Sequence, residues 1–332
     1  MTHNIAASFR TSWACRLFSA GMVVVSTMVA GPTHAAAYPN KPITVIVPFP
    51  AGGSVDTMMR ILAPHLSQEL HQTIVVENAG GAGGAIGAGR AAKEDSDGYT
   101  LLAGSNNDMV MAPVLNENVT YRASDFVPVS MLISSTPMLV ARADLPQSSL
   151  DEVIEQLRAK PQSLSYGSPG YGTMQHVVVE ELQQKAGVRM LHVPYKGSAP
   201  LINDLLGGQV DMAVMVPSTA VQHLKSGRIK ALGISQAKRL KEFPDVPVFN
   251  ESKYLDDVEM IGWVGLFAPA GLADDRQQKL ALAVQAALSN PDVQQRLSDI
   301  GMEAADAEQQ KTMAERVKQD TEKVRGLNLK FE

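Results

Sequence analysis

Two short glycine-rich stretches carry the residues best suited to holding a negatively charged group. The first glycine turn, residues 48–53, follows the apolar run Ile43–Val47 and precedes a helical pattern. A strand, a glycine turn and a helix N-terminus present backbone N–H groups to an anion, and no side chain blocks the approach. Ser54 is the expected N-cap, and Asp56 in the first helical turn suits the positive end of the helix dipole. The alternative is a tight loop that binds nothing.

The second glycine turn, residues 168–172, repeats this order of strand end, Gly/Pro turn and helix start. Gly170 and Gly172 can adopt positive φ and bring backbone amides close to a ligand. Thr173 is the expected N-cap. His176, one turn into the helix, could hydrogen-bond a ligand or orient the loop, and we favour the second role. If both turns face one cleft, two helix dipoles converge on one anion.

Patterns for catalysis, metals and nucleotides fail. Ser168 lacks the glycine two places before it that a nucleophile elbow has. There is no HExxH motif, and the histidines beyond residue 37 have no metal-ligand spacing. Residues 87–92 match G-x-G-x-x-A, but they start too far beyond the preceding strand, so close packing of a helix on a sheet explains them better. We expect no enzymatic activity, no metal and no cofactor.

The N-terminus has the organisation of a secretory signal. Arg10 and Arg16 precede an apolar run at residues 17–31, which ends in the small residues 35–37. The run is shorter than the roughly 20 residues that a membrane span needs. We therefore predict a signal peptide at residues 1–37, cleaved before Tyr38, and a periplasmic protein. The single cysteine, Cys15, leaves with it, so the mature chain has no disulfide.

Length and charge limit the partners. The 332 residues, 45% of them apolar, suffice for two domains. Without Arg10 and Arg16 the chain has 27 basic residues against 34 acidic ones, a formal charge of −7. With no basic run, nucleic acid and anionic membranes are not expected as partners. An anionic ligand must be captured by local dipoles, because the net field repels it.

Hydrophobic periodicity predicts two α/β domains. Strands at 43–47, 73–77 and 99–104 alternate with helices at about 55–70 and 85–93, which is typical of a parallel sheet. The second half repeats the pattern, and long extended runs at 126–141 and 259–268 would cross between the domains. The predicted domains are residues 38–135 plus 265–332, and 136–264, with ligand in the cleft at the carboxyl ends of the strands. The other predicted elements are strands 164–167, 190–195, 210–216 and 229–235, and helices from about 149 to 160, 173–185, 199–206, 219–225, 274–288, 291–300 and 307–324.

These motifs resemble those of the Bug proteins, the TctC-type receptors of tripartite tricarboxylate transporters. The likeness begins with residues 38–56 and continues through Glu77-Asn-Ala-Gly-Gly-Ala-Gly-Gly and Asp97-Gly-Tyr-Thr-Leu-Leu. It then covers Gly167-Ser-Pro-Gly-Tyr-Gly-Thr with His176, and Val193-Pro-Tyr-Lys-Gly. It ends with residues 204–211 and 267–271, so it spans the mature chain in order.

The resemblance implies a type II periplasmic binding fold, two α/β domains that close on a ligand like a flytrap. It also implies that backbone groups and ordered water in the two glycine turns hold a ligand carboxylate, while the loop after the third strand and the region around Tyr195 line the rest. Carried over by position, the expected ligand-binding residues are Phe49, Ala51, Gly52, Gly53, Asp56, Ser105, Met109, Ser168, Gly170, Gly172, Thr173, His176, Tyr195 and Met215.

Two departures from the family bear on the ligand. Many members have His and then Asn-Pro after the third strand, where this chain reads Asp108-Met-Val-Met-Ala-Pro. Many have an acidic residue where Met215 stands. Losing a pocket carboxylate removes the partner for an amino group. We therefore expect a carboxylate with an apolar or aromatic body, touching Met109 and Met215, rather than an amino acid.

The sequence thus predicts a monomeric periplasmic receptor that delivers a small carboxylate to the integral membrane subunits of a tripartite tricarboxylate-type transporter. One alternative is a ligand-sensing receptor that serves a signalling system. A remote alternative is a secreted serine hydrolase that uses Ser168 and His176.

Overall fold

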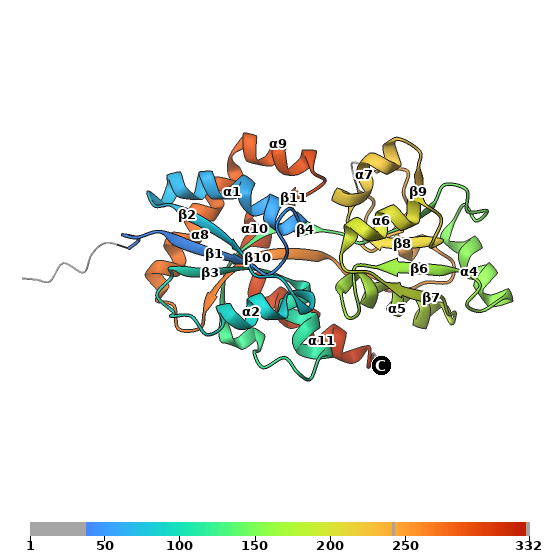
Figure 1. Cartoon of the computed structure of the whole chain (residues 1–332), viewed down its shortest axis with the longest axis horizontal. Helices are drawn as coiled ribbons and strands as arrows, with labels where there is room; N and C mark the ends of the chain where they lie inside the picture. Colours follow the sequence, from blue (N-terminus) through green and yellow to red (C-terminus); the bar gives the residue numbers. More distant parts are fainter. Residues whose placement is uncertain (1–37, 241–242, 330–332) are drawn as a thin grey trace, which may run out of the picture. The chain divides into compact units, whose positions relative to one another are not determined.

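The structure is a computed structural model that describes residues 38–240 and 243–329. The predicted signal peptide lies outside these residues. Residues Tyr38–Glu332 form one compact unit, which contains two mixed β-sheets with helices on their faces (Figure 1). The α/β class is as predicted, while the division of this unit into two domains stays a prediction. No helix in the described part of the chain is both long enough and apolar enough to cross a membrane.

Sheet A is built around its first strand. β1 lies between β2 and β3 and is parallel to both, with Val45 opposite Val76 on one side and Leu101 on the other. β10 then runs antiparallel to β3 and to β4. The strand order is β11-β4-β10-β3-β1-β2. The strands are β1 (Ile43–Val47), β2 (Ile74–Asn78), β3 (Thr100–Ser105), β4 (Phe126–Ser135), β10 (Gly262–Pro269) and β11 (Glu303–Ala304).

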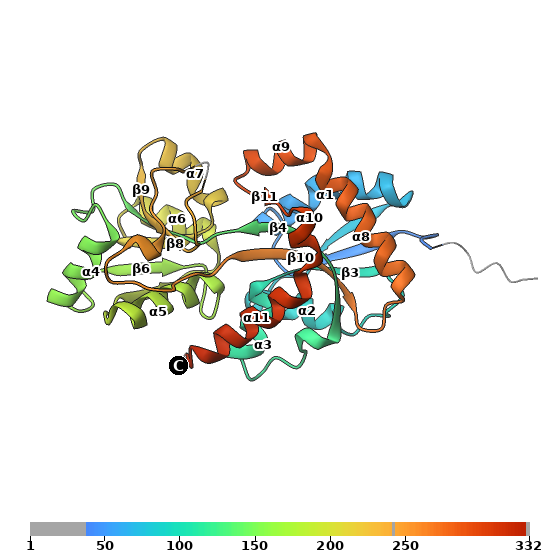
Figure 2. The same cartoon turned by 180° about the vertical axis from the view of Figure 1, so that it is seen from behind.

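Alternating side chains of β1 face different helices, as expected for a strand that is buried on both sides. Val45 and Val47 belong to the hydrophobic cluster that includes α1 (Ser54–Leu70), α8 (Asp274–Ser289) and α9 (Pro291–Asp299). Ile46 belongs to the cluster that includes α2 (Ala85–Ala91) and α11 (Met313–Gly326). Figures 1 and 2 show these two groups of helices on opposite faces of sheet A.

Close packing of α2 explains the dinucleotide-like motif. A Cβ atom at Gly87 would lie 2.5 Å from the carbonyl oxygen of Ala79 and 2.8 Å from the Cα atom of Pro48. Only glycine allows the helix to come this close to the loops that follow β1 and β2. The interpretation of residues 87–92 as a packing motif is therefore confirmed.

Sheet B repeats the arrangement of sheet A. β6 lies between β7 and β8 and is parallel to both, and β5 runs antiparallel to β8 and β9. One face packs against α4 (Leu150–Ala159) and α5 (Met174–Ala186), and the other against α6 (Ser198–Leu206) and α7 (Pro217–Lys225). The strand order is β7-β6-β8-β5-β9, with β5 (Met138–Arg142), β6 (Ser165–Ser168), β7 (Leu191–Pro194), β8 (Met212–Met215) and β9 (Ile229–Ile234).

The connections between the sheets match the two predicted crossings. The extended run at 126–141 divides at Thr136 and Pro137, so that β4 joins sheet A and β5 joins sheet B. β10 brings the chain back to sheet A. The single helix predicted at 307–324 is wrong, since α10 (Ala307–Lys311) and α11 are separated at Thr312, and the break lets Met313 pack against Gly265. The sequence also missed the π-helical turn η2 (Asn107–Met111) and α3 (Ala112–Leu115).

Candidate functional site

The first glycine turn leaves the start of α1 without a side-chain cap. The N-cap is Gly53, in an extended conformation with φ −72° and ψ 169°, and Ser54 is already helical. The expectation that Ser54 caps the helix is therefore wrong by one residue. No side chain accepts from the first-turn amides, which have no partners within the helix either. The N–H groups of Ser54, Val55 and Asp56 are thus available to an anion.

Asp56 holds the first glycine turn together from within. The residue is 2% exposed, and its carboxylate accepts hydrogen bonds from Gly52 N at 2.8 Å, Arg60 Nε at 3.0 Å and Asn78 Nδ2 at 3.0 Å. The Asn78 amide also donates to the carbonyl oxygen of Phe49. Burial alone would raise the pKa of Asp56, but these hydrogen bonds hold it below its usual range. Asp56 therefore shapes the turn, and its lone pairs already have protein donors.

The second glycine turn is closed by its own side chains. Thr173 is the N-cap of α5, as predicted: its hydroxyl accepts from His176 N at 3.4 Å and donates to Gly170 O at 2.9 Å. Gly172, at φ +66°, donates its N–H to His176 Nδ1 at 3.1 Å. The first amide of α5, Met174 N, donates to Asn107 Oδ1 at 2.8 Å. His176 thus orients the loop, which is the role that the sequence favoured.

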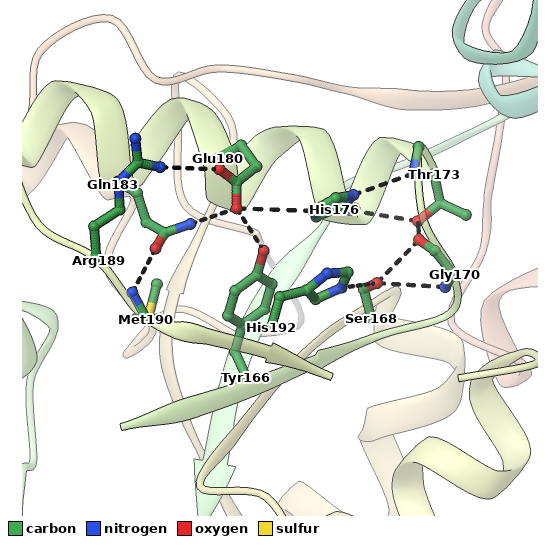
Figure 3. Close-up of polar contacts among 11 residues, drawn as sticks. Tyr166, Ser168, Gly170, Thr173, His176, Glu180, Gln183, Arg189, Met190 and His192 are labelled. Atoms are coloured by element: carbon green, nitrogen blue, oxygen red, sulfur yellow. Dashed lines mark hydrogen bonds and ion pairs between the residues drawn. The ribbon is translucent and has the colours of Figure 1, made fainter. Parts of the chain in front are cut away.

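Ser168 pairs with a histidine other than the one expected. Its Oγ lies 2.7 Å from Nε2 of His192, which comes from the neighbouring strand β7 (Figure 3). The Ser168 side chain is fully buried. His192 Nδ1 has no hydrogen-bond partner among the described residues, so the orienting carboxylate of a catalytic triad is missing. These contacts do not form a nucleophilic site with Ser168 and His176.

The segment that follows β3 lies next to both glycine turns. Asn107 accepts from the first amide of α5, and a Cβ atom at Gly84 would lie 2.9 Å from Asp108 Cβ and 3.3 Å from the Phe49 ring. Asp108 is fully buried and accepts from the amide and the hydroxyl of Ser105, at 2.9 and 2.6 Å. Burial raises the pKa of Asp108 to about 7. Within the described residues, no hydrogen bond or ion pair joins the two turns directly.

The two methionines expected to touch the ligand are buried in different places. Met109 is 1% exposed and belongs to the cluster that includes α2 and α11. Met215 has no exposed surface and packs with α6 and α7 in a separate cluster. Tyr195 is half-buried and donates its hydroxyl to Asp204 Oδ2 at 2.9 Å. Burial, followed by the Asp204 contact, raises the pKa of Tyr195 to about 12.

Uncapped helix starts are concentrated at the carboxyl ends of the parallel strands. α1, α2, α6 and α7 follow β1, β2, β7 and β8, and none of the four has a side-chain cap. The exception is α5, which follows β6 and is capped by Thr173. α8, which follows β10, is also uncapped, whereas α4, α9 and α10 begin with Ser149, Asn290 and Asp306 as caps. Open strand-end helices supply positive dipole ends where the fold places its ligand.

In the described part of the chain, the two glycine turns lie apart from the two surface cavities, and no cluster of metal-ligating side chains is present. No cluster of potential metal ligands occurs in residues 38–240 and 243–329. Surface cavities of about 520 and 340 Å³ lie beside α2 and beside α11. Neither cavity includes a residue of either glycine turn. The candidate site therefore depends on the direction of backbone amides and on helix ends.

Sequence reasoning missed three residues that shape these turns: Asn78, Asn107 and His192. Asn78 ends β2, and Asn107 lies just beyond β3. Both residues lie at the carboxyl end of a strand that neighbours β1, the strand followed by the first glycine turn. This position was the signal available in the sequence. His192 could be found only from the register of β7 against β6.

Residues 58–329 match the model of the tripartite tricarboxylate transporter family receptor, TctC. The chain belongs to this family. Among curated relatives, the Bordetella pertussis protein BugT is 38% identical over 253 residues, which is 76% of this chain and 77% of BugT. The TctC family consists of solute-binding proteins, so this protein is a periplasmic-type solute-binding receptor and not an enzyme.

Solved TctC-type structures share the fold. MatC from Rhodopseudomonas palustris, solved with bound malate, is 31% identical and covers 87% of this chain and 99% of its own, with a TM-score of 0.79. The R. palustris protein Rpa4515, solved with adipate, is 28% identical and covers 87% of this chain and 97% of its own, also with a TM-score of 0.79. These similarities confirm the predicted type of fold.

Proposed function

We propose that this receptor captures a small carboxylate between its two glycine turns, in the periplasm after cleavage before Tyr38. It then delivers the ligand, as a monomer, to the integral membrane subunits of a tripartite tricarboxylate-type transporter. The observation that carries the proposal is the start of α1: Gly53 leaves the first-turn amides uncapped while Asp56 is turned inward and bonded. An anion supplied from outside completes that helix end.

The remaining predicted residues divide by their contacts. Phe49, Ala51, Gly52 and Gly53 belong to the open turn, and Ser105 braces the segment that lies between the turns. Ser168, Gly170, Gly172 and Thr173 would give the second turn its shape. Met109 and Met215 have almost no exposed surface, so their contact with a ligand requires a rearrangement on binding.

The ligand class follows from the relatives and from the side chains. Malate and adipate are the dicarboxylates named for MatC and Rpa4515, and similar loops would take the same group here. The carboxylate of Asp56 is occupied by protein donors and Met215 replaces an acid, so an ammonium group has no free partner at these two positions. We propose a carboxylate with an apolar or aromatic body in preference to an amino acid.

A thermal-shift screen tests the ligand class. The panel contains malate, adipate, benzoate, aspartate and glutamate. A ligand present at 100 times its Kd adds about 2.7 kcal/mol to the stability of the native state. The proposal expects stabilisation by at least one carboxylate that lacks an amino group. Aspartate or glutamate as the tightest ligand would contradict the ligand class, and no stabilisation by any carboxylate would contradict the function.

A glycine substitution tests the first turn. Gly53 has an ordinary φ, so Gly53→Val adds no backbone strain, although the new Cβ lies 3.1 Å from the Pro50 carbonyl oxygen. The side chain would cover the approach to the first-turn amides, and we expect binding to fall by at least about tenfold. The control is Gly326→Val, where a Cβ meets nothing within 4 Å. Wild-type affinity in a folded Gly53→Val protein would remove the first turn from the site.

A further inference from the structure

His192 reaches the second glycine turn from a neighbouring strand. It lies on β7, in register with Tyr166 of β6, and its Nε2 is 2.7 Å from Ser168 Oγ. The Ser168 hydroxyl is also 3.0 Å from Gly170 O. Figure 3 shows His192 and Ser168 side by side beneath the loop that carries Gly170 and Thr173. The contact therefore joins an edge strand of sheet B to the proposed ligand-binding turn.

Hydrogen-bond accounting selects one tautomer of His192. If Nε2 carries the proton, it donates to Ser168 Oγ, and the Ser168 hydroxyl donates to Gly170 O. The buried Nδ1 atom, which has no partner in the described part of the chain, is then only an unused acceptor. The other tautomer would bury an N–H donor without an acceptor, which costs more than an unused lone pair. The geometry thus favours a neutral ring with its proton on Nε2.

A ring stack connects His192 to the second contact with the same turn. The rings of His192 and His176 have centroids 3.9 Å apart at an angle of 13°. The Tyr166 ring also stacks on His192, with centroids 4.8 Å apart. Tyr171 meets both imidazoles edge-on. His176 accepts the N–H of Gly172. One stack therefore supports Gly170 through Ser168 and Gly172 through His176.

We propose that His192 is a positioning residue for ligand capture: its neutral imidazole, through Ser168 and through the stack on His176, holds the second glycine turn in its binding shape, and protonation of the stack releases that turn. The inference rests on the proposed function of this turn. It assigns to β7 a part in binding that the glycine turns by themselves do not explain.

Burial keeps the two rings neutral despite a carboxylate nearby. Glu180 of α5 lies 3.7 Å from His176 Nε2, and it is also bonded to Tyr166 and paired with Arg189. Tyr171 adds a ring edge and no charge. Burial lowers the pKa of His192 to about 4, and burial together with the charge of His192 lowers the pKa of His176 to about 3. Both rings are therefore neutral at pH 7. Protonation at low pH would disrupt their stacking and so release the second glycine turn.

The experiment compares His192→Leu, His192→Gln and the control His223→Gln, which changes a histidine of α7 outside this network. Glutamine can place an amide donor near Ser168 Oγ and does not titrate, whereas leucine has no donor. At pH 7 we expect His192→Leu to weaken carboxylate binding about tenfold, as the loss of one buried hydrogen bond predicts. His192→Gln keeps the donor to Ser168 Oγ but loses the ring that stacks on His176, so its affinity should lie between those of wild type and His192→Leu. It should also lose less affinity than wild type as the pH falls from 6 to 4.

Nuclear magnetic resonance of the unliganded protein distinguishes a positioning role from a general effect of His192 on folding, because it reports the His192 tautomer and the environment of the loop amides. The proton of His192 should be on Nε2 at pH 7. The amide resonance of Gly172 should shift in both His192 variants, because both lose the ring that stacks on His176, whereas the Gly170 amide should shift more in His192→Leu than in His192→Gln. Neither amide should shift in His223→Gln. An Nδ1–H tautomer, unmoved glycine amides, or wild-type affinity in His192→Leu would overturn the proposal. If the wild type binds no carboxylate at all, the proposed function fails, and the tautomer and amide shifts still decide the positioning role.

Discussion

The two glycine turns occupy equivalent places in the two sheets, yet their helices begin differently. β1 and β6 each lie between two parallel strands, and each is followed by a glycine turn and a helix. The N-cap of α1 is Gly53, which has no side chain to accept a hydrogen bond, whereas the N-cap of α5 is Thr173, whose hydroxyl accepts a hydrogen bond from the amide of His176. The first glycine turn thus offers free N–H donors, and the second glycine turn offers a fixed shape. The same local unit can serve for capture or for alignment, depending on its cap.

The groups that support the turns differ in the sign of their response to pH. Near the first turn, the buried Asp108 has a pKa raised to about 7, so the folded state holds its proton more tightly than the unfolded state does. Behind the second turn, burial lowers the pKa of His176 and His192, so the folded state resists protonation. The stability contributed by the first region falls as the pH rises, and that of the second increases.

Removing Asp56 should have the largest effect on this contrast. Asp56→Ala leaves Gly52 N and the Asn78 amide without their shared acceptor and frees Arg60. We expect the free energy of unfolding to fall by about 3 kcal/mol, because a buried carboxylate with several donors is lost. Urea unfolding curves measure the change. A loss below about 1 kcal/mol would mean that the first turn keeps its shape without Asp56.

Adding a cap to α1 should convert the first turn into a turn like the second. Gly53→Asp places a carboxylate at an N-cap with suitable φ and ψ. The new carboxylate can accept hydrogen bonds from the same N–H groups that we propose bind the ligand. We expect roughly 30-fold weaker carboxylate binding, about 2 kcal/mol, with no loss of thermal stability. Calorimetric titration and thermal unfolding together test this. Unchanged affinity would show that these amides are not the anion site.

The last prediction concerns the slope of stability against pH. Asp108→Asn removes the group whose folded pKa is raised, so the mutant should gain stability relative to wild type as the pH rises from about 4 to about 7. A rise in the pKa from 3.8 in the unfolded state to about 7 in the folded state corresponds to a relative gain of up to about 4 kcal/mol across that window, measured by urea midpoints at several pH values. A difference between the two proteins that stays constant with pH would mean that Asp108 titrates normally.

Most elements could be predicted because their hydrophobic periods are strong. The strand–turn–helix order around Gly53 and Gly172, and the two crossings, are local or follow from alternation along the chain. The start of α1 was misplaced by one residue, because glycine and serine are both acceptable N-caps and only the backbone angles at Gly53 decide between them. Helix 307–324 was predicted unbroken because the break at Thr312 reflects the burial of Met313, which no local pattern shows.

The sequence by itself determined the family, the α/β class, the two glycine turns and the cap at Thr173, because these depend on residues that are neighbours along the chain. Only the tertiary structure decided which groups complete each turn. Asn78 reaches Asp56 across 22 positions, Asn107 reaches Met174 across 67, and His192 reaches Ser168 across 24. Strand register and the packing of the segments that connect the two sheets bring such partners together. Local sequence patterns reveal neither of these.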